Sequence, residues 1–477
     1  MWSLLNSLLF LGLLASFVSA APARLQKRSF KVERVRNVNF KGYNGRRELL
    51  KAYSKYSMPI PDSLLESIRA EAAAAKAAEA AAVAATSVNA EAADAVSAEA
   101  VETVKAGDII LGGIEFIPAS PQGAPAAPGQ APAVIPNPRS IFTARERVTV
   151  YWGQRRPSAG PGDVEYLSPV NIGGQTLNLD FDSGSSDLWV FSTLLARTTQ
   201  RGHVVYDPSK STSFKMLQGA SFQISYGDGS QAAGLVGTDT VDIGGVSVAN
   251  QAVELATQVS GSFVQDTANN GLVGLAFSNI NAVKPEKQKT FFDNVMSSLA
   301  EPLFTADLRK GAVGAYEFGR IDTSKFTGPM NFVPINATKG FWQFTSDKFA
   351  VGDGQPQPST PGAQAIADTG TTLILADKAV VEAYYSQVPG AKNDQAAGGI
   401  TIPCDAAMPD LKLDVGGVMA KVRGSDIVFA KVENNTCFGG MQVSTNSVQI
   451  YGDIFFKSQF VVFNGGNKTL GVADHAV

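Results

Sequence analysis

Residues 181–190, Phe-Asp-Ser-Gly-Ser-Ser-Asp-Leu-Trp-Val, have a near-copy in residues 367–376, Ala-Asp-Thr-Gly-Thr-Thr-Leu-Ile-Leu-Ala. Both copies place an aspartate, a hydroxyl side chain, a glycine and a second hydroxyl side chain between an apolar residue and an apolar run. Each copy follows a segment typical of a strand, so we predict a strand that ends at the aspartate and opens into a glycine turn. Two such loops related by a twofold axis would bring Asp182 and Asp368 side by side.

A second pair of similar segments supports a duplicated chain. Residues 271–277, Gly-Leu-Val-Gly-Leu-Ala-Phe, begin 89 residues after Asp182 (271 minus 182), and residues 450–456, Ile-Tyr-Gly-Asp-Ile-Phe-Phe, begin 82 residues after Asp368 (450 minus 368). Most of the chain from residue 164 onward consists of short alternating segments separated by glycine turns, with helical spacing only at 288–299 and 377–388. This pattern predicts a mainly β protein.

The two aspartate loops and the segments that follow them resemble the pepsin-like aspartic proteases, most closely the secreted enzymes of filamentous fungi. The resemblance runs from about Tyr166 to Ala476. It implies a bilobal pepsin-like fold, with two pseudo-twofold-related, β-barrel-like lobes and the active-site cleft between them. The N-terminal lobe would span 164–335 and the C-terminal lobe 336–477.

The resemblance assigns catalysis to Asp182 and Asp368. Peptide hydrolysis needs a nucleophile and a proton for the leaving nitrogen. Two touching carboxyl groups do not ionise together easily, so the pair keeps one proton. The ionised member would activate a water, while the protonated member would hydrogen-bond the substrate carbonyl. Sequence does not tell which aspartate holds the proton. No metal and no cofactor are expected.

Six neighbouring residues would support this pair. The glycines allow backbone N–H groups to approach the carboxylates. By resemblance, the first hydroxyl residue of each loop bonds across to the opposite loop, and the second contacts the outer carboxylate oxygens or the substrate. The supporting residues are Ser183, Gly184, Ser185, Thr369, Gly370 and Thr371.

Histidine is scarce, which excludes several other chemistries. The sequence contains only His203 and His475. A Ser-His-Asp or Cys-His mechanism would require one of them, and a zinc site of the histidine type would require more. Carboxylates therefore remain as the acid and base candidates.

Residues 222–230, Phe-Gln-Ile-Ser-Tyr-Gly-Asp-Gly-Ser, match the flap of the family, a hairpin that closes over bound peptide. By resemblance, Tyr226 packs over the cleft with its hydroxyl directed toward Trp189, and Gly227 offers backbone bonds to substrate. Asp228 would lie above the pocket for the residue before the cut bond, where an acid could accept lysine. A purely structural role of Asp228 in the turn is the alternative.

Charge is segregated along the chain. Residues 21–69 carry 12 Lys or Arg and 4 Asp or Glu, a net +8, whereas residues 163–477 carry 21 and 30, a net −9. A basic leader and an acidic body favour a propeptide that inhibits its own enzyme. By resemblance, Lys55 would pair with the catalytic carboxylates and Tyr56 would pack beside it. Lys51 is the competing candidate for the inhibitory lysine.

The propeptide is expected to cover residues 21–145, with an end that is uncertain up to about residue 163. Its basic inhibitory part is 21–69. An Ala-rich segment at 70–106 has a strongly helix-forming composition and predicts a solvated helix or disorder. A segment rich in Pro, Gly and Ala at 112–138 is typical of a linker.

The N-terminus predicts export. Residues 1–20 have no charged side chain, contain an apolar core and end in Val-Ser-Ala, the pattern of a secretory signal. In an exported chain the two cysteines, Cys404 and Cys437, are expected to pair. Sequons at Asn336, Asn434 and Asn467 are candidate glycosylation sites.

We therefore expect a secreted, extracellular monomer that acts on protein and peptide substrates. It should hydrolyse peptide bonds at acidic pH and prefer hydrophobic residues around the cut. No membrane anchor and no nucleic-acid partner are expected.

Two alternatives differ in function. The first is an inactive secreted peptide-binding protein of the same fold, which would normally have lost one aspartate or the flap tyrosine. The second is an actin-like ATPase, because residues 368–372, Asp-Thr-Gly-Thr-Thr, also resemble a phosphate-binding loop. A signal peptide and a strand-dominated body argue against the ATPase.

Overall fold

The computed structural model describes residues 27–37, 42–91, 166–225 and 231–476. The signal segment 1–20, the linker 112–138 and the end of the leader lie outside the described residues, as do Tyr226, Gly227 and Asp228. Of the Ala-rich segment, only residues up to 91 are described, and they are helical. The chain divides into two compact units, Ala72–Gln154 and the rest. The rest of the chain is described below.

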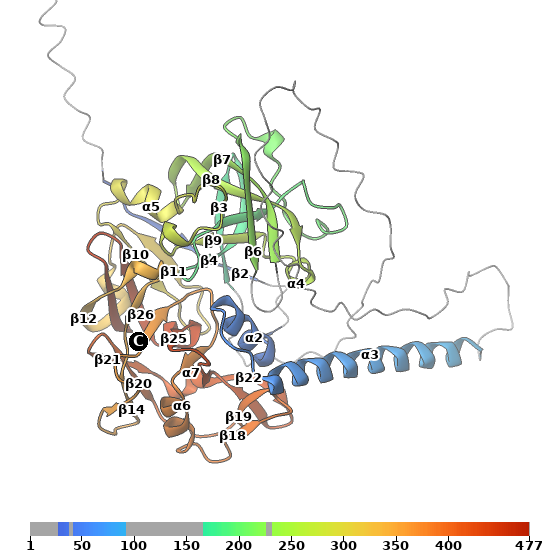
Figure 1. The fold of residues 1–477 in the computed structure, drawn as a ribbon, viewed down its shortest axis with the longest axis vertical. Coiled ribbons are helices and arrows are strands. Elements are labelled where there is room, and N and C mark those ends of the chain that lie inside the picture. The colour runs from blue at the N-terminus through green and yellow to red at the C-terminus, as the bar shows by residue number, and fades with distance from the viewer. Residues whose placement is uncertain (1–26, 38–41, 92–165, 226–230, 477) are drawn as a thin grey trace, which may run out of the picture. The chain divides into compact units, whose positions relative to one another are not determined.

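The first half of the body is a closed barrel (Figure 1). Its strands are, in chain order, β3 (Tyr166–Ile172), β4 (Gln175–Asp182), β5 (Leu188–Phe191), β6 (Lys215–Ser225), β7 (Gln231–Ile243), β8 (Val246–Val259) and β9 (Gly271–Gly274). The sheet order is β2-β3-β4-β9-β5-β8-β7-β6, where β2 (Val35–Arg36) comes from the leader, and an additional β3–β7 pairing closes the barrel.

Glycine pairs produce the hairpins of this barrel. Gly173 and Gly174 join β3 to β4 with φ of 54° and 85°, and Gly244 and Gly245 join β7 to β8 with φ of 60° and 86°. Two consecutive positive φ angles are the requirement of a tight turn that matches the twist of the strands. Both glycine pairs therefore form the tight turns that the alternating pattern of short segments and glycines predicts.

The second half contains three sheets of its own. A five-stranded sheet has the order β13 (Gln343–Thr345), β16 (Gln364–Ala367), β25 (Val448–Tyr451), β17 (Ile374–Ala376), β24 (Met441–Val443). One four-stranded sheet consists of β15 (Gln357–Pro358), β14 (Lys348–Val351), β20 (Leu411–Val415) and β21 (Val418–Val422). The other consists of β18 (Lys392–Asp394), β19 (Gly399–Pro403), β23 (Thr436–Gly439) and β22 (Val428–Glu433).

A six-stranded sheet combines distant parts of the chain. Its order is β1 (Phe30–Glu33), β11 (Ala315–Phe318), β10 (Leu303–Asp307), β26 (Gln459–Asn464), β27 (Thr469–His475), β12 (Phe326–Pro334). Strand β1 belongs to the leader, and Phe30 stacks on Phe318 of β11 with ring centroids 4.8 Å apart. The leader thus supplies an edge strand of this sheet.

Helices are few in the body. The predicted helix at 288–299 is α5 (Phe291–Val295), continued by a 3-10 turn over Met296–Ser298. The helix predicted at 377–388 is α6 (Lys378–Tyr385). Asp377 does precede α6, but its side chain makes no capping bond and instead accepts a hydrogen bond from the hydroxyl of Ser359.

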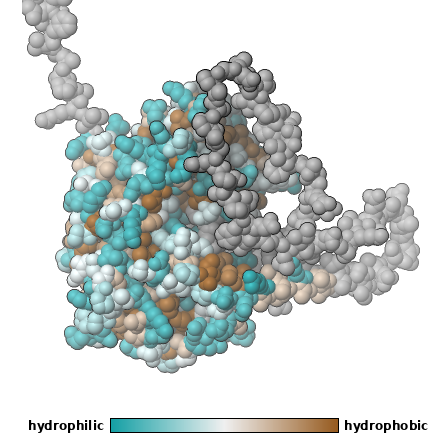
Figure 2. All heavy atoms as spheres, in the orientation of Figure 1, coloured by the Kyte–Doolittle hydropathy of each residue, from teal (hydrophilic) through white to brown (hydrophobic). Residues whose placement is uncertain are grey.

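The leader contributes two longer helices, α2 (Gly45–Lys55) and α3 (Asp62–Glu91). Leu49, Ala52 and Tyr53 of α2 are buried in the same apolar core as the body strands. On the face seen in Figure 2 hydrophilic residues predominate and hydrophobic ones are scattered among them. Among the described helices none is long and apolar enough to cross a membrane.

Candidate active site

The two aspartate loops have the same strand framework. Strand β4 ends at Asp182 and runs parallel to β9, which is antiparallel to β5. Strand β16 ends just before Asp368 and runs parallel to β25, which is antiparallel to β17. Each repeat segment identified in the sequence therefore lies beside its own aspartate loop, and this equivalence gives the two loops matching geometry.

Each carboxylate is held by its own loop in the same way. For Asp182, the backbone N–H of Gly184 donates to Oδ1 at 2.8 Å and the hydroxyl of Ser185 donates to Oδ2 at 2.6 Å. For Asp368, the N–H of Gly370 donates to Oδ1 at 3.0 Å. The hydroxyl of Thr371 donates to Asp368 Oδ2. The inner and outer oxygens of both carboxylates thus have fixed donors.

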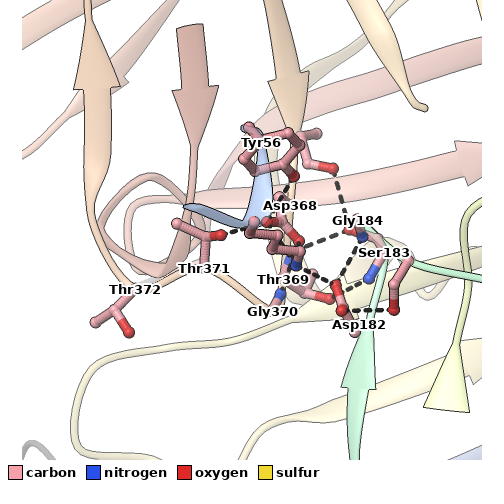
Figure 3. A network of polar contacts seen from close by, with 12 residues as sticks. Tyr56, Asp182, Ser183, Gly184, Asp368, Thr369, Gly370, Thr371 and Thr372 are labelled. Carbon is pink, nitrogen blue, oxygen red and sulfur yellow. Dashed lines mark hydrogen bonds and ion pairs between the residues drawn. The ribbon is translucent and has the colours of Figure 1, made fainter. Parts of the chain in front are cut away.

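The loops also bond to each other through Ser183 and Thr369 (Figure 3). The N–H of each residue donates to the hydroxyl oxygen of the other, at 3.0 and 2.9 Å. Each hydroxyl then donates to a carbonyl of the opposite chain segment, Ser183 to Ala367 at 3.0 Å and Thr369 to Phe181 at 2.7 Å. This reciprocal set locks the two strand ends together, as the sequence predicted for these hydroxyl residues.

Glycine is required at the third position of each loop. A Cβ at Gly184 would lie 2.4 Å from Asp368 Oδ1, and a Cβ at Gly370 would lie 2.3 Å from Asp182 Oδ1. Such distances are well inside van der Waals contact, so any side chain would force the loops apart. The absence of a side chain therefore sets how closely the two carboxylates approach.

Lys55 of the leader bonds both carboxylates. Its Nζ lies 2.7 Å from Asp182 Oδ1, and 3.0 and 2.9 Å from the two oxygens of Asp368. The Lys55 side chain is 7% exposed and the two aspartates are 1% and 0% exposed. Tyr56 donates its hydroxyl to Asp368 Oδ2 at 2.7 Å. Of the two lysine candidates, the structure brings Lys55 and not Lys51 into contact with the pair.

The electrostatics of the pair follow from burial and from Lys55. Burial raises the pKa of Asp182 to about 6, although the Lys55 charge opposes this. Burial acts in the same direction on Asp368, but the Lys55 charge and the hydrogen bonds of Asp182, Thr371 and Lys55 outweigh it and lower the pKa of Asp368 to about 2. The pair therefore ionises in two separated steps and, with Lys55 bound, holds one proton only between pH about 2 and pH about 6.

Three further polar groups lie near the pair, and the sequence analysis missed them. Asp180 precedes Asp182 by two residues on β4; burial raises its pKa, and the charges of Lys51 and Lys55 oppose the rise. Burial also raises the pKa of Asp453, to about 7. Glu48 of α2 accepts a hydrogen bond of 2.7 Å from the Thr372 hydroxyl. For Asp180 the sequence held a signal, because alternate residues of a strand point to the same face.

Of the predicted flap and cleft residues, the structure describes only Trp189. Its ring is 1% exposed and lies 4.9 Å from the Phe263 ring in an edge-on arrangement. It is thus part of the barrel core next to the first aspartate loop.

The cysteines and the sequon asparagines fall on residues that the structure describes. Cys404 and Cys437 form a disulfide. The sequon residues Asn336, Asn434 and Asn467 are all exposed. Within the described ranges, no group of three or more His, Cys, Asp or Glu residues could hold a metal ion.

Comparison with known proteins gives a consistent result. The family described as eukaryotic aspartyl protease matches residues 165–475. Penicillopepsin-1 of Penicillium rubens is 53% identical over 317 residues, which span 66% of this chain and 79% of the relative. Aspergillopepsin-1 of Aspergillus oryzae is 50% identical over 322 residues, 67% of this chain and 79% of the relative. Aspartic protease PEP3 of Coccidioides posadasii is 49% identical over 324 residues, which span 66% of this chain and 73% of the relative.

Proposed function

The chain belongs to the eukaryotic aspartyl protease family and is an aspartic endopeptidase, and we propose that Asp182 and Asp368 form its catalytic pair. One observation carries this assignment: both carboxylates contact the single ammonium group of Lys55, at 2.7 to 3.0 Å. Two carboxylates at such a short separation can share a proton and act on one water molecule. The family membership excludes the actin-like ATPase.

The reaction needs one protonated and one ionised carboxyl group. The ionised member takes a proton from a water as its oxygen attacks the substrate carbonyl carbon. The protonated member hydrogen-bonds the carbonyl oxygen, and a proton then passes to the leaving nitrogen as the C–N bond breaks. The donors on the aspartates keep both carboxyl groups oriented, and the reciprocal Ser183–Thr369 bonds keep their separation constant.

We propose that the chain is made as an inactive precursor. Residues 21–145 would be the propeptide after a signal peptide at 1–20, with lobes at 164–335 and 336–477. Lys55 supports inhibition because it neutralises both carboxylates, and Tyr56 covers the outer oxygen of Asp368. The buried apolar side chains of α2 hold this segment on the body.

Acid is expected to release the leader. The Lys55 charge lowers the pKa of both carboxyl groups, so the inhibited site binds fewer protons than the free one. Falling pH therefore favours the free site. The free pair then retains one proton, which is the form that catalysis requires, so activity should be acidic.

Substrate preference and location complete the proposal. A cleft lined by apolar side chains favours hydrophobic residues around the cut. Acceptance of lysine would rest on Asp228. Export is supported by the disulfide and by the exposed sequons, and we propose a secreted, extracellular monomer.

The catalytic assignment is tested by Asp182→Asn and Asp368→Asn, with the exposed Asp353→Asn as a matched control. Loss of the acid–base function should reduce turnover of an acid-denatured protein substrate by at least about 10²- to 10⁴-fold. The control should keep full activity, and all three proteins should melt as cooperatively as the parent. An Asp182→Asn enzyme with undiminished turnover would contradict the assignment and point to another catalytic group.

A further inference from the structure

A second pair of buried carboxyl groups lies behind the first aspartate loop. Asp187 is the last residue before β5, and Glu254 lies on the neighbouring strand β8, where it is in register with Trp189. Asp187 is 5% exposed and Glu254 is 1% exposed. Burial of two acids side by side is costly unless they share a proton or have a cation between them.

The hydrogen bonds distinguish the two acids. Asp187 Oδ1 accepts bonds from Asn281 Nδ2 at 2.8 Å and from the N–H of Ala282 at 2.7 Å. The same Nδ2 donates to Glu254 Oε1 at 3.1 Å. Asn281 is oriented this way because its Oδ1 accepts the backbone N–H groups of Val283 and Gln288, at 3.2 and 2.8 Å.

Glu254 has the environment of a neutral acid. Its Oε2 is buried and receives no hydrogen bond from any residue that the structure describes. An ionised carboxylate needs donors on both oxygens, whereas a protonated one donates from one of them. The two carboxyl groups converge on the same amide nitrogen, Asn281 Nδ2, and the pKa of each responds to the other. Glu254 is therefore the partner that carries the proton, and Asp187 is the partner that accepts it.

The charged groups around the pair act unequally. Burial and the Asp187 charge raise the pKa of Glu254 well above its usual range. Burial also raises the pKa of Asp187, as does the charge of Asp182, but the N–H of Ala282, the hydrogen bond with Glu254 and the charge of Lys287 oppose this rise. The Lys287 Nζ donates to the carbonyls of Asn279 and Asn281.

The pair is connected to the catalytic loop by short steps. Asn281 Nδ2 also donates to the Ser186 carbonyl at 3.1 Å, and Asp187 O accepts the N–H of Gly274 at 2.8 Å. Ser185 directly precedes Ser186, and its hydroxyl donates a hydrogen bond to Asp182 Oδ2. A displacement of Asp187 would therefore pass directly to the hydroxyl that orients the first carboxylate.

We propose that Glu254 is a positioning residue whose proton, shared with Asp187, holds the Asp182 loop in its working geometry, and that the loop loosens as rising pH removes this proton. The catalytic meaning rests on the proposed role of Asp182, but the proton-sharing itself does not. Because the folded chain keeps a proton that the unfolded chain has lost, stability is greatest in acid and falls as pH rises.

Glu254→Gln tests this inference in the full-length chain. Glutamine keeps the shape of a protonated glutamate, can donate to Asp187 and has no proton to lose. An Asp368→Asn background prevents self-digestion, and Glu286→Gln, an exposed change on a nearby segment, is the matched control. The unfolding midpoint is measured from pH 5.5 to 8.5 for each protein.

The parent and the Glu286→Gln control should lose stability with rising pH faster than Glu254→Gln. When a single group is protonated in the folded chain and ionised in the unfolded chain, the folding equilibrium constant falls about tenfold for each pH unit. This holds between the pKa of the group in the unfolded chain and its pKa in the folded chain. A packing role alone would lower the midpoint equally at every pH. Parallel curves for parent and Glu254→Gln would overturn the proposal.

If Glu254→Gln does not fold, Asp187→Asn provides the second test. It removes the negative neighbour, so ionisation of Glu254 costs less and the pH dependence should again flatten. An Asp187→Asn curve parallel to that of the parent would overturn the proposal. Unfolding needs no activity, so failure here is distinguishable from failure of the catalytic assignment. That assignment would fail only in the turnover of the Asp182→Asn and Asp368→Asn enzymes.

Discussion

Lys55→Met should release the precursor from its own inhibition. The Lys55 ammonium makes three contacts of 2.7 to 3.0 Å with two carboxylates that are at most 1% exposed. Removing one partner of a buried ion pair costs about 3–5 kcal/mol. Part of this cost disappears because the acid pair can bind a proton when the ammonium is gone. We therefore take the lower end, about 3 kcal/mol, or roughly a hundredfold in leader binding.

The assay follows cleavage of a quenched fluorescent peptide by freshly purified precursor between pH 4 and 7. The parent should stay silent at neutral pH and begin to convert only below pH about 6, where Asp182, the first carboxyl group of the pair to take a proton, becomes protonated. Lys55→Met should convert at a pH about one to two units higher, because acid no longer has to displace a cation.

Lys76→Met is the matched control, since Lys76 is an exposed lysine of the leader on α3. Its conversion should stay close to that of the parent. The reasoning is refuted if Lys55→Met converts at the same pH as the parent, or if Lys76→Met shifts conversion as much as Lys55→Met does.

Three further predictions concern single contacts. Thr369→Val leaves the buried N–H of Ser183 without its acceptor and should destabilise the protein by about 2 kcal/mol or more; Thr369→Ser should restore the midpoint, and equal midpoints for the two variants would contradict this. Replacing Cys404 and Cys437 by alanine opens a link across 33 residues and should cost roughly 3–4 kcal/mol in denaturant unfolding, whereas an unchanged midpoint would show that the link adds nothing. Asp228→Thr should sharply reduce cleavage after Lys and spare cleavage after Phe in a matched peptide series, while equal losses would mean that Asp228 only shapes its turn.

Local chemistry explains why so much of the fold was predictable. Glycine pairs such as 173–174 specify tight hairpins, and the alternation before Asp182 specifies a strand that ends there. The internal repeat then implied two matching loops without any long-range information. The contacts of Ser183 with Thr369 were implied by the resemblance to the pepsin-like proteases.

Long-range pairing set the limit of prediction. Asp187, Glu254 and Asn281 are far apart in the sequence, and only the parallel pairing of β5 with β8 brings the two acids together. Thr372 bonds Glu48 across 324 positions, a contact that no local pattern encodes. His203 is partly buried, and its ring stacks on that of Phe191 with the ring centroids 3.8 Å apart, a contact that local sequence does not indicate.

The order in which Lys55, Asp182 and Asp368 occur along the chain has a consequence in time. A ribosome adding about 5–20 residues per second delivers the second aspartate roughly 10 to 40 seconds after the first, because 186 residues separate them. During that interval each half is chemically inert, since neither holds both carboxylates. Lys55, the proposed inhibitory lysine, is made before either aspartate. Under the proposed inhibition, the chain at no moment of its synthesis holds a complete and unblocked pair, and the order of translation would itself protect the cell that makes this protease.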